Sequence, residues 1–301
     1  MPRSTGGASS GDAAVGVCAY VRAFIREVVS DPQVSAVVMT TVCDQMRRGA
    51  ELITRERDLP LFLMNVPSTW TTAAAQELYR DELERLGRFM CSLDGEHPSK
   101  DRLAAVMMDY DSKRSAVRAA RRYLSPQHYS EAIAAFHRDG VQASAAASRG
   151  ESVMGVPLAV VGGPLLQKDF WLFEVVEQAG GRIVLDATET GERTMPPPFD
   201  QQAVRNDPLM ELTFAYFAGI PDAFRRPNSG FYGWLKGELW DRGVRGILFR
   251  RHVWCDTWHA ELRHLEEWAG MPVAELDGDD DDDGIPSRLT TRVQALLEVL
   301  A

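Results

Sequence analysis

The sequence predicts an α/β protein with two parallel-sheet domains joined by a helical connector. Short apolar runs rich in β-branched residues alternate with helical patterns near both ends of the chain, whereas the stretch from Thr71 to about Ser148 has helical patterns only. The chain has 301 residues, enough for two domains of about 150 residues each. Strands that alternate with helices favour parallel sheets covered by helices.

Three elements are predicted in the first part of the chain, after a polar tail. Residues 1–12 are rich in Gly and Ser and bury little apolar surface, so we expect a flexible segment. Apolar runs at 34–41 and 60–66 predict two strands, and Met46 and Ile53 lie on one face of a helix between them. The predicted order is strand, helix, strand.

A second alternating series starts at Pro157, where the run PLAVVGG predicts a strand. It continues with a helix over 169–178, strands over 182–186 and 244–250, a helix over 256–269, a strand over 272–276 and a final helix over 287–300. The proline-rich segment 189–207 predicts a long loop or lid instead of a packed element.

These patterns predict two Rossmann-like (flavodoxin-like) domains. The expected parts are a tail over 1–12, an N-terminal α/β domain over 13–95, a helical connector over 96–152 and a C-terminal α/β domain over 153–301.

Composition excludes several classes of protein. The formal net charge of -10 disfavours binding to nucleic acid, because phosphate contacts need clustered Lys and Arg. No run approaches the roughly 20 apolar residues that span a bilayer, so we expect no membrane segment and a cytoplasmic protein. Its four cysteines lie far apart, and in a reducing compartment we expect ligands or free thiols instead of disulfides.

An internal repeat singles out two of these cysteines. The two matching segments are VSAVVMTTVCDQMRRGAELITRERDLPLFLMNV and VRGILFRRHVWCDTWHAELRHLEEWAGMPVAEL. Each reads as strand, Cys-Asp, helix, Pro, strand, and Cys43 precedes Pro60 by 17 positions, as Cys255 precedes Pro272. Such self-similarity predicts two copies of one supersecondary unit.

The repeat has a geometric consequence for Cys43 and Cys255. Loops after the carboxyl ends of parallel strands form the ligand crevice of such sheets, and two facing domains would bring the two residues together. Each cysteine starts a helix, whose dipole favours a thiolate, and Asp44 and Asp256 are expected to cap the same helix ends. The alternative is a pair of cysteines buried for packing alone.

Several segments resemble one known family. They are GVCAYVRAF, TTVCDQMRR with LPLFLMNVPSTW, GVPLAVVGGPLLQKDFWLFEVVEQAGGRIVLDATETGER, and GVRGILFRRHVWCDTWHAE with LTTRVQALLEVL. From about Val15 onward the chain resembles the cluster-binding subunits of 2-hydroxyacyl-CoA dehydratases and benzoyl-CoA reductases. The resemblance implies one [4Fe-4S] cluster held by Cys18, Cys43 and Cys255. Cys91 has no counterpart in the family, and no ligand role is expected for it.

The resemblance also implies a chemistry. Three thiolates leave one iron without a cysteine, and that iron can bind water, sulfide or substrate oxygen as a Lewis acid. An ATP-hydrolysing activator protein is expected to supply the electron. The acyl-CoA or related thioester then becomes a ketyl radical, loses its 2-hydroxyl group and ends as an enoyl-CoA. Family members carry a longer segment before the first cluster cysteine, so part of the pocket is expected from a homologous second subunit or a second copy.

Other residues are weaker candidates. Gly163, with Lys168 near the next helix, could cradle a phosphate or CoA group, but a tight turn is favoured. Glu189 and Arg193 follow a strand in the crevice, where they could orient substrate or form an ion-paired loop. No catalytic residue is assigned.

Three further features suggest no separate site. His252 and His259 beside Cys255 leave zinc as a runner-up, although a supporting role near the cysteine is favoured. The acidic run 279–283 is expected to be a solvated loop. A basic helix face is expected to be exposed and salt-bridged; it consists of Lys113, Arg114, Arg118, Arg121 and Arg122.

Three functions remain open at this point. The first is the iron-sulfur subunit of a dehydratase-like lyase, working in a heterodimer or other dimer. The second is a reductase of the benzoyl-CoA or double-cubane type, and the third is a non-catalytic scaffold or electron relay that carries a cluster. The acyl substrate is not predicted.

Overall fold

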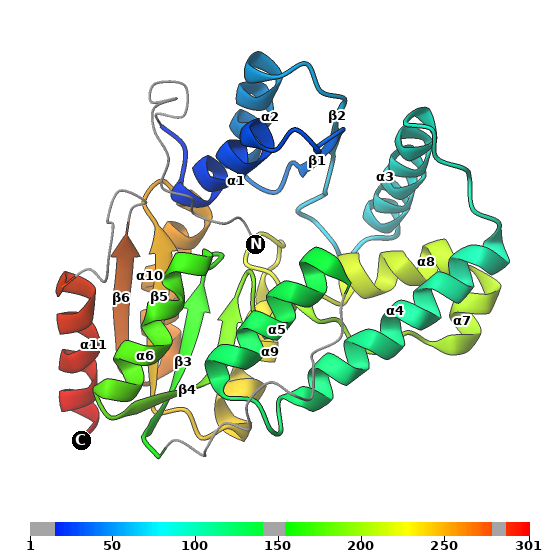
Figure 1. Ribbon diagram of the computed structural model, residues 1–301. Helices are drawn as coiled ribbons and strands as arrows, with labels where there is room; N and C mark the ends of the chain where they lie inside the picture. Colours follow the sequence, from blue (N-terminus) through cyan, green and yellow to red (C-terminus); the bar gives the residue numbers. More distant parts are fainter. Residues whose placement is uncertain (1–15, 141–153, 279–286) are drawn as a thin grey trace.

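The computed structural model describes residues 16–140, 154–278 and 287–301 of the protein (Figure 1). The predicted tail and the acidic run at 279–283 therefore lie outside the described residues. The fold is α/β with parallel strands, as predicted: in the described part, β1 pairs with β2, and a second sheet has the order β4-β3-β5-β6. In these three stretches no helix has both the length and the apolar character that crossing a membrane requires.

The first sheet belongs to a small unit near the N-terminus. Its elements are α1 (Ala19–Ser30), β1 (Val37–Thr40), α2 (Asp44–Glu56) and β2 (Leu61–Met64). Apolar side chains of α1, β1 and α2 form one buried cluster, which includes Val21, Met39 and Ile53. Helix α1 was not predicted, although Val21, Ile25 and Val28 are buried along one side of it.

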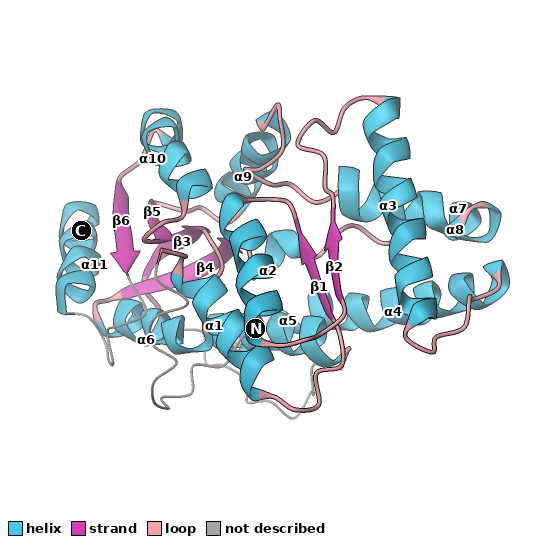
Figure 2. Cartoon of the chain, turned by 90° about the horizontal axis from the view of Figure 1, so that it is seen from above, coloured by secondary structure: helices cyan, strands magenta, loops and turns pink. Residues whose placement is uncertain are grey.

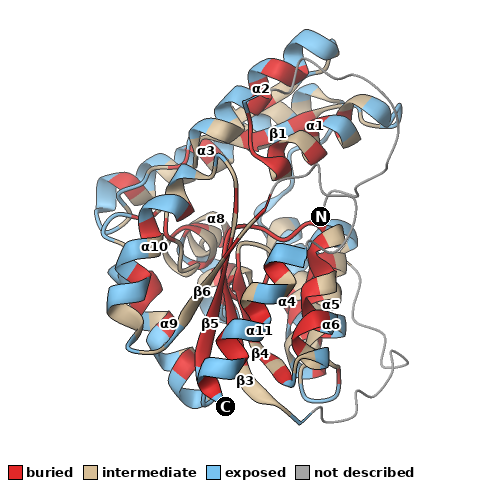
Figure 3. Ribbon diagram, turned by 90° about the vertical axis from the view of Figure 1, so that its left-hand side faces the viewer, coloured by how far each residue is buried: buried red, intermediate tan, exposed pale blue. Residues whose placement is uncertain are grey.

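The second sheet is buried on both faces. Its strands are β3 (Val156–Gly162), β4 (Gly181–Thr188), β5 (Gly246–His252) and β6 (Val273–Gly278). Side chains alternate along β3, so Leu158 faces the cluster formed with α6 (Trp171–Gln178) and α11 (Ser287–Leu300), and Ala159 faces the cluster formed with α9 (Ser229–Asp241) and α10 (Asp256–Ala269). Figure 3 shows β3, β4 and β5 as mostly buried and the outer sides of the helices as exposed, whereas β6 is mostly of intermediate burial.

The region between the sheets is helical, as predicted. Its elements are α3 (Ala73–Ser92), α4 (Lys100–Ala120) and α5 (Pro126–Asp139), joined from later in the chain by α7 (Gln201–Asn206), α8 (Pro208–Leu212) and the π-helical turn η3 (Thr213–Ala218). The first three begin at Thr72, Ser99 and Ser125, whose hydroxyl groups accept hydrogen bonds from the first turn. Helix α5 also packs on β4, since Ser130 Oγ donates to Asp186 Oδ2 over 2.7 Å.

The prediction that 189–207 is a loop that does not pack was wrong. The segment contains the 3₁₀ turn η2 (Glu192–Thr194) and α7, and it buries Arg193, Phe199 and Val204. The prolines interrupt regular secondary structure but do not keep the segment at the surface. Phe199, for example, packs beside Met107 of α4. The guanidinium of Arg114 also lies over the Phe199 ring, 4.5 Å from its centre.

The repeat seen in the sequence has the same backbone pairing in both copies. Val37 N donates to Pro60 O over 2.9 Å, and Ile247 N donates to Pro272 O over 2.9 Å. Each proline directly precedes the second strand of its pair, and the helix between the strands is α2 in one copy and α10 in the other. The two segments therefore fold as the same strand-helix-strand unit, as predicted.

The two units meet along a short seam. Trp70 Nε1 donates to Pro227 O over 2.9 Å, and Arg226 N donates to Ser68 O over 2.8 Å. Ala19 and Ala23 of α1 pack against Leu166, which follows β3. Figure 2 shows β1 and β2 between α2 and α3, apart from the larger sheet. The domain boundaries at 95 and 152 stay a prediction.

Candidate metal centre

Cys18, Cys43 and Cys255 line one cavity of about 350 Å³. The N-terminal unit supplies one wall through the starts of α1 and α2, and the larger sheet supplies the other through turns that follow its strands. Cys18 is buried, and the other two are partly buried. The cavity thus collects three sulfur atoms from segments more than 200 positions apart in the chain.

The three cysteines occupy equivalent positions. Each is the N-cap residue of a helix, α1 for Cys18, α2 for Cys43 and α10 for Cys255. The free amides and the positive end of the helix dipole at these starts stabilise negative charge. We predicted Asp44 and Asp256 as caps, and this was wrong: both are the first helical residue, because the cysteine before each already holds the cap position.

The starts of α1 and α2 are linked directly. Cys18 N donates to Gln45 Oε1 over 2.8 Å, so a side chain from the first turn of α2 fixes the backbone at the first cysteine. On the opposite wall, Cys255 N donates to His252 O over 3.1 Å, and Trp254 adopts a left-handed backbone with φ of 70°. A non-glycine residue in that region is strained, which marks the turn before Cys255 as one that the surrounding structure holds in place.

All three thiols prefer the protonated form in the metal-free chain. Burial raises the pKa of Cys43 to about 11 and that of Cys255 to about 12, and it also raises the pKa of Cys18. First-turn amides act the other way and lower the pKa of each thiol. The cysteines also raise one another's pKa, as Cys18 and Cys43 do for Cys255, because like charges close together disfavour ionisation.

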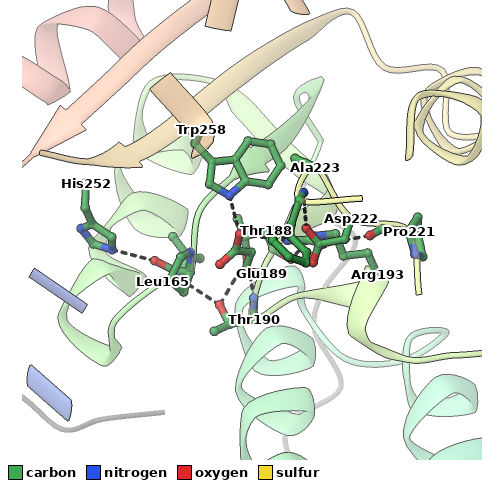
Figure 4. Close-up of polar contacts among 12 residues, drawn as sticks. Leu165, Thr188, Glu189, Thr190, Arg193, Pro221, Asp222, Ala223, His252 and Trp258 are labelled. Atoms are coloured by element: carbon green, nitrogen blue, oxygen red, sulfur yellow. Dashed lines mark hydrogen bonds and ion pairs between the residues drawn. The ribbon is translucent and has the colours of Figure 1, made fainter. Parts of the chain in front are cut away.

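A carboxylate completes the polar wall of the cavity. Glu189 directly follows β4 and lines the cavity with the cysteines. Its Oε1 accepts a hydrogen bond from Trp258 Nε1 at 2.6 Å and lies 3.5 Å from Arg193 Nη2 (Figure 4). Burial raises the pKa of Glu189 to about 7, although Arg193 and Trp258 lower it. The carboxyl group can therefore exchange a proton near neutral pH.

The guanidinium of Arg193 forms ion pairs with two carboxylates, those of Glu189 and Asp222. Its side chain is 1% exposed, and Nη1 lies 3.2 Å from Asp222 Oδ2 and donates to Pro221 O over 2.8 Å. Nε donates to Thr188 O over 3.1 Å. Figure 4 shows Arg193 beside Glu189 and Asp222. Arg193 does not line the cavity itself but pairs with Glu189 and Asp222, which do, and its contact with substrate stays a prediction.

The other sequence candidates lie elsewhere or have other partners. Gly163 N donates to Arg250 O over 2.9 Å and Gly163 is not among the lining residues, so its contact with substrate stays a prediction. His252 lines the cavity but its Nε2 bonds Pro164 O over 2.8 Å, and His259 is exposed on α10. Cys91 lies on α3, outside the lining.

The predicted exposed basic face on α4 is only partly correct. Lys113 pairs with Asp109 on the surface over 2.8 Å, but Arg114 is buried and bonded to Asp111. Arg121 reaches the larger sheet, where its Nη2 donates to Val184 O over 2.7 Å. These side chains serve packing between α4 and neighbouring elements.

Three residues of the site escaped sequence reasoning. They are Gln45, Asp222 and Trp258. Gln45 and Trp258 lie two and three positions after a Cys-Asp cysteine, and that proximity was the available signal. Asp222 lies in a segment without a strand or helix pattern, so nothing in the sequence tied it to Arg193.

Comparison with known proteins adds a family. The family model described as 2-hydroxyglutaryl-CoA dehydratase, D-component, matches residues 12–300. A search of curated proteins found no match to the chain.

Among the residues that the structure describes, no three His, Cys, Asp or Glu side chains are grouped closely enough to hold a single metal ion.

Proposed function

Because the chain belongs to the 2-hydroxyglutaryl-CoA dehydratase D-component family, we propose that it is the [4Fe-4S]-binding subunit of a 2-hydroxyacyl-CoA dehydratase-like enzyme. The supporting observation is that three cysteines, each at a helix N-terminus, line one cavity. The proposed ligands are Cys18, Cys43 and Cys255.

The donor set fits an iron-sulfur cluster. Thiolates are the protein ligands of such clusters, and three of them leave one iron open to another ligand. The raised pKa values of the thiols mean that protons must leave when metal binds, as metal sites in general require. Three helix N-termini then offset the negative charge of the thiolates. A site for zinc alone would need a closer group of ligands than the described residues form.

When bound, the cluster supplies a single low-potential electron and a Lewis-acidic iron to a 2-hydroxyacyl thioester. The chain's residues do the rest. The cavity, of about 350 Å³, offers space beside the proposed ligands. Arg193 holds the Glu189 and Asp222 carboxylates beside the sulfur ligands. The substrate loses water by the one-electron ketyl route and leaves as an enoyl-CoA.

The proposal includes partners. A homologous second subunit, or a second copy of the chain, completes the substrate pocket, and an ATP-dependent iron-sulfur activator delivers the electron. We place the reaction in the cytoplasm, where thiols stay reduced. The two sheets correspond to the proposed domains 13–95 and 153–301, and the cavity lies between them. A benzoyl-CoA or double-cubane type reductase would use the same three ligands without eliminating water.

The test starts with metal content. Protein purified without oxygen should be brown and contain about four irons per chain, and Cys43→Ser or Cys255→Ser should lower the iron content sharply. Cys91→Ser is the matched control and should retain it. Zinc in place of iron, or equal loss in all three variants, would contradict the ligand assignment.

Activity is tested separately. The complex with its partner and activator should convert a 2-hydroxyacyl-CoA into an enoyl-CoA, followed by mass spectrometry of the thioester. Loaded protein that forms only reduced thioester supports the reductase instead. Loaded protein that changes no thioester supports the scaffold or relay.

A further inference from the structure

A second cavity, of about 150 Å³, lies at the seam between the two units. Trp70 and Pro227, which are hydrogen-bonded to each other across the seam, both line it. The segment 218–222 and the first turn of α9 form much of the remaining wall. Of the described residues that line it, Asp222 alone also lines the cysteine cavity. It is therefore a separate space with its own set of side chains.

The cavity contains a buried cation without a counter-charge, Arg225, which is 8% exposed. The other buried arginines of the described residues are each ion-paired with carboxylates: Arg114 with Asp111, Arg193 with Glu189 and Asp222, and Arg250 with Asp169. Arg225 forms no ion pair in the part of the chain that the structure describes. Burying an unpaired charge is costly, so a bound anion would relieve this position.

The guanidinium of Arg225 is held in place but keeps a nitrogen for a ligand. Nη1 donates to Pro67 O over 3.3 Å, and the group lies over the Phe217 ring, 4.3 Å from its centre. Nε is buried without a partner. Nη2 has no hydrogen bond within the described residues either, and unlike Nε it is not sealed from solvent. Because Arg225 lines the cavity, Nη2 is available to a group bound there.

Helix α9 begins at the same cavity without a side-chain cap. Its N-cap residue, Asn228, makes no capping hydrogen bond, and its Nδ2 instead donates to both oxygens of Glu261 over 2.9 Å. Gly230, in the first turn, lines the cavity, and its amide has no acceptor in the described stretches of the chain. Uncapped first-turn amides at the positive end of a helix dipole favour an anion.

Asp222 is the one carboxylate among the described residues that line this cavity. Its Oδ2 lies 3.2 Å from Arg193 Nη1, and its Oδ1 accepts from Phe224 N over 2.8 Å. Both oxygens are thus bound by groups other than Arg225. The charge of Asp222 is balanced by Arg193, whereas the charge of Arg225 is not balanced.

The rest of the wall is largely apolar and aromatic. Trp70, Phe231 and Trp234 line it together with Pro221. The indole N–H of Trp70 is already bonded to the backbone. A doubly charged inorganic anion would leave most of its oxygens against these rings without donors, which is unfavourable. The wall therefore suits a ligand with one charged end and an apolar body.

We propose that this cavity binds a free short-chain monocarboxylate. Its carboxylate accepts hydrogen bonds from Arg225 Nη2 and Gly230 N, and its alkyl chain packs against Trp70 and Trp234. An apolar cavity of about 150 Å³ holds one benzene molecule, so a ligand of about six heavy atoms, such as butyrate, fits. A sphere of that volume is about 7 Å across, so one small ligand can touch both donors. The inference does not require the cluster.

The experiment measures binding of sodium butyrate to the full metal-free chain by isothermal titration calorimetry at constant ionic strength. Saturable binding with a Kd in the millimolar range is expected for so small a ligand. Butyramide has the same shape without the charge and should bind at least about tenfold more weakly, because it loses a charge-assisted hydrogen bond. Absence of saturable butyrate binding, or butyramide or sulfate binding as tightly as butyrate, would overturn the proposal.

Variants test the role of Arg225. Arg225→Met keeps the length of the side chain and removes the charge, so the affinity for butyrate should fall about ten- to hundredfold. Arg263→Met is the matched control, since the Arg263 side chain is 90% exposed on α10, and it should bind butyrate as the wild-type protein does. If Arg225→Met does not fold, Gly230→Ala replaces it, because a Cβ there would stand 3.3 Å from Trp70 Cζ2 and narrow the cavity. Unchanged affinity in the folded variant would overturn the proposal.

The place of binding is read from indole N–H signals in ¹⁵N spectra of the wild-type protein, assigned with single Trp→Phe variants. Butyrate should shift the signals of Trp70 and Trp234, which line the cavity. The signal of Trp240, a residue of α9 that is 85% exposed, should not move. Saturable butyrate binding that leaves the Trp70 and Trp234 signals in place would overturn the proposal. Since the chain is free of metal, none of these outcomes depends on whether it binds iron.

Discussion

The indole Nε1 of Trp258 donates a hydrogen bond to Oε1 of Glu189 over 2.6 Å. Trp258 is fully buried between Phe231 and Phe249, with ring centres 5.6 and 6.0 Å away. One side chain therefore belongs both to the apolar core under β5 and to the polar wall of the cavity. A substitution of Trp258 therefore alters both the packing of the core and the hydrogen bonding of Glu189.

Trp258→Phe should destabilise the metal-free chain by about 2–3 kcal/mol, because it leaves a cavity and removes the bond to Glu189. It should also raise the pKa of Glu189 further, since the bond lowers it. Urea unfolding of the metal-free chain measures the loss of stability. Trp240→Phe is the control, because Trp240 is 85% exposed, and its effect should stay within about 0.5 kcal/mol. Equal effects of the two changes would contradict the structure.

The raised pKa of Glu189, about 7, predicts how stability depends on pH. A carboxyl group that holds its proton more tightly when folded binds more protons than the unfolded chain between about pH 4.5 and pH 7, so its contribution to the free energy of unfolding falls as pH rises through that window. Glu189→Gln should remove this decline. Unfolding free energies of the metal-free chain at pH 5, 6, 7 and 8 measure it.

The control for that series is Glu267→Gln, which removes one carboxylate from the exposed side of α10. The difference in the free energy of unfolding between the wild-type and Glu189→Gln proteins should widen steadily from pH 5 to pH 7 and then stay constant. Parallel curves for wild-type and Glu189→Gln proteins would show that Glu189 titrates like an exposed carboxylate.

Raised thiol pKa values predict slow alkylation in the metal-free chain. With the pKa of Cys43 at about 11 against roughly 8.5 for a free cysteine, the thiolate fraction at pH 8.5 falls by roughly 100-fold. Iodoacetamide labelling of the Cys43 peptide, followed by mass spectrometry, should be correspondingly slower in folded than in urea-unfolded protein. The rate in folded protein should still rise above pH 9.5. A plateau near pH 9 would argue against the raised pKa.

Gly162→Ala should destabilise the protein by ~3 kcal/mol or more, because φ is 141° and a Cβ would stand 1.9 Å from Arg250 O. Gly233→Ala on α9 meets no atom within 4 Å and should instead stabilise by about 0.5–1 kcal/mol. Thermal unfolding of both variants measures the difference. Tolerance of Gly162→Ala would mean that β3 and β5 do not approach as described.

The sequence predicted those parts of the fold that depend on local patterns. Alternating apolar runs predicted the parallel strands, and the 17-residue spacing predicted that Cys43 and Cys255 begin equivalent helices. Helix α1 was missed because a Gly- and Ser-rich stretch precedes it closely. Burial of 189–207 was missed because it depends on Phe199 meeting Met107, a contact between distant segments.

The candidate site, too, was predictable from the sequence only in part. Resemblance and repeat named the three cysteines, whereas their environment depends on tertiary contacts. Arg193 bonds Asp222 across 29 positions, and Trp258 bonds Glu189 across 69. No local pattern encodes such pairs. The identity of the cap residues was mistaken because cysteine is not a usual helix cap, whereas aspartate is.

The link between Cys18 and Gln45 makes the three proposed sulfur ligands unequal. Two belong to the small N-terminal unit and are already held near each other, and the third lies on the larger sheet. A cluster bound by all three would act as a cross-link between two sheets that otherwise touch along a narrow seam, so the two units would unfold as one cooperative block when loaded. Removal of iron by a chelator would then separate the two units before either core unfolds. The loss of iron would be seen as the replacement of one melting transition by two.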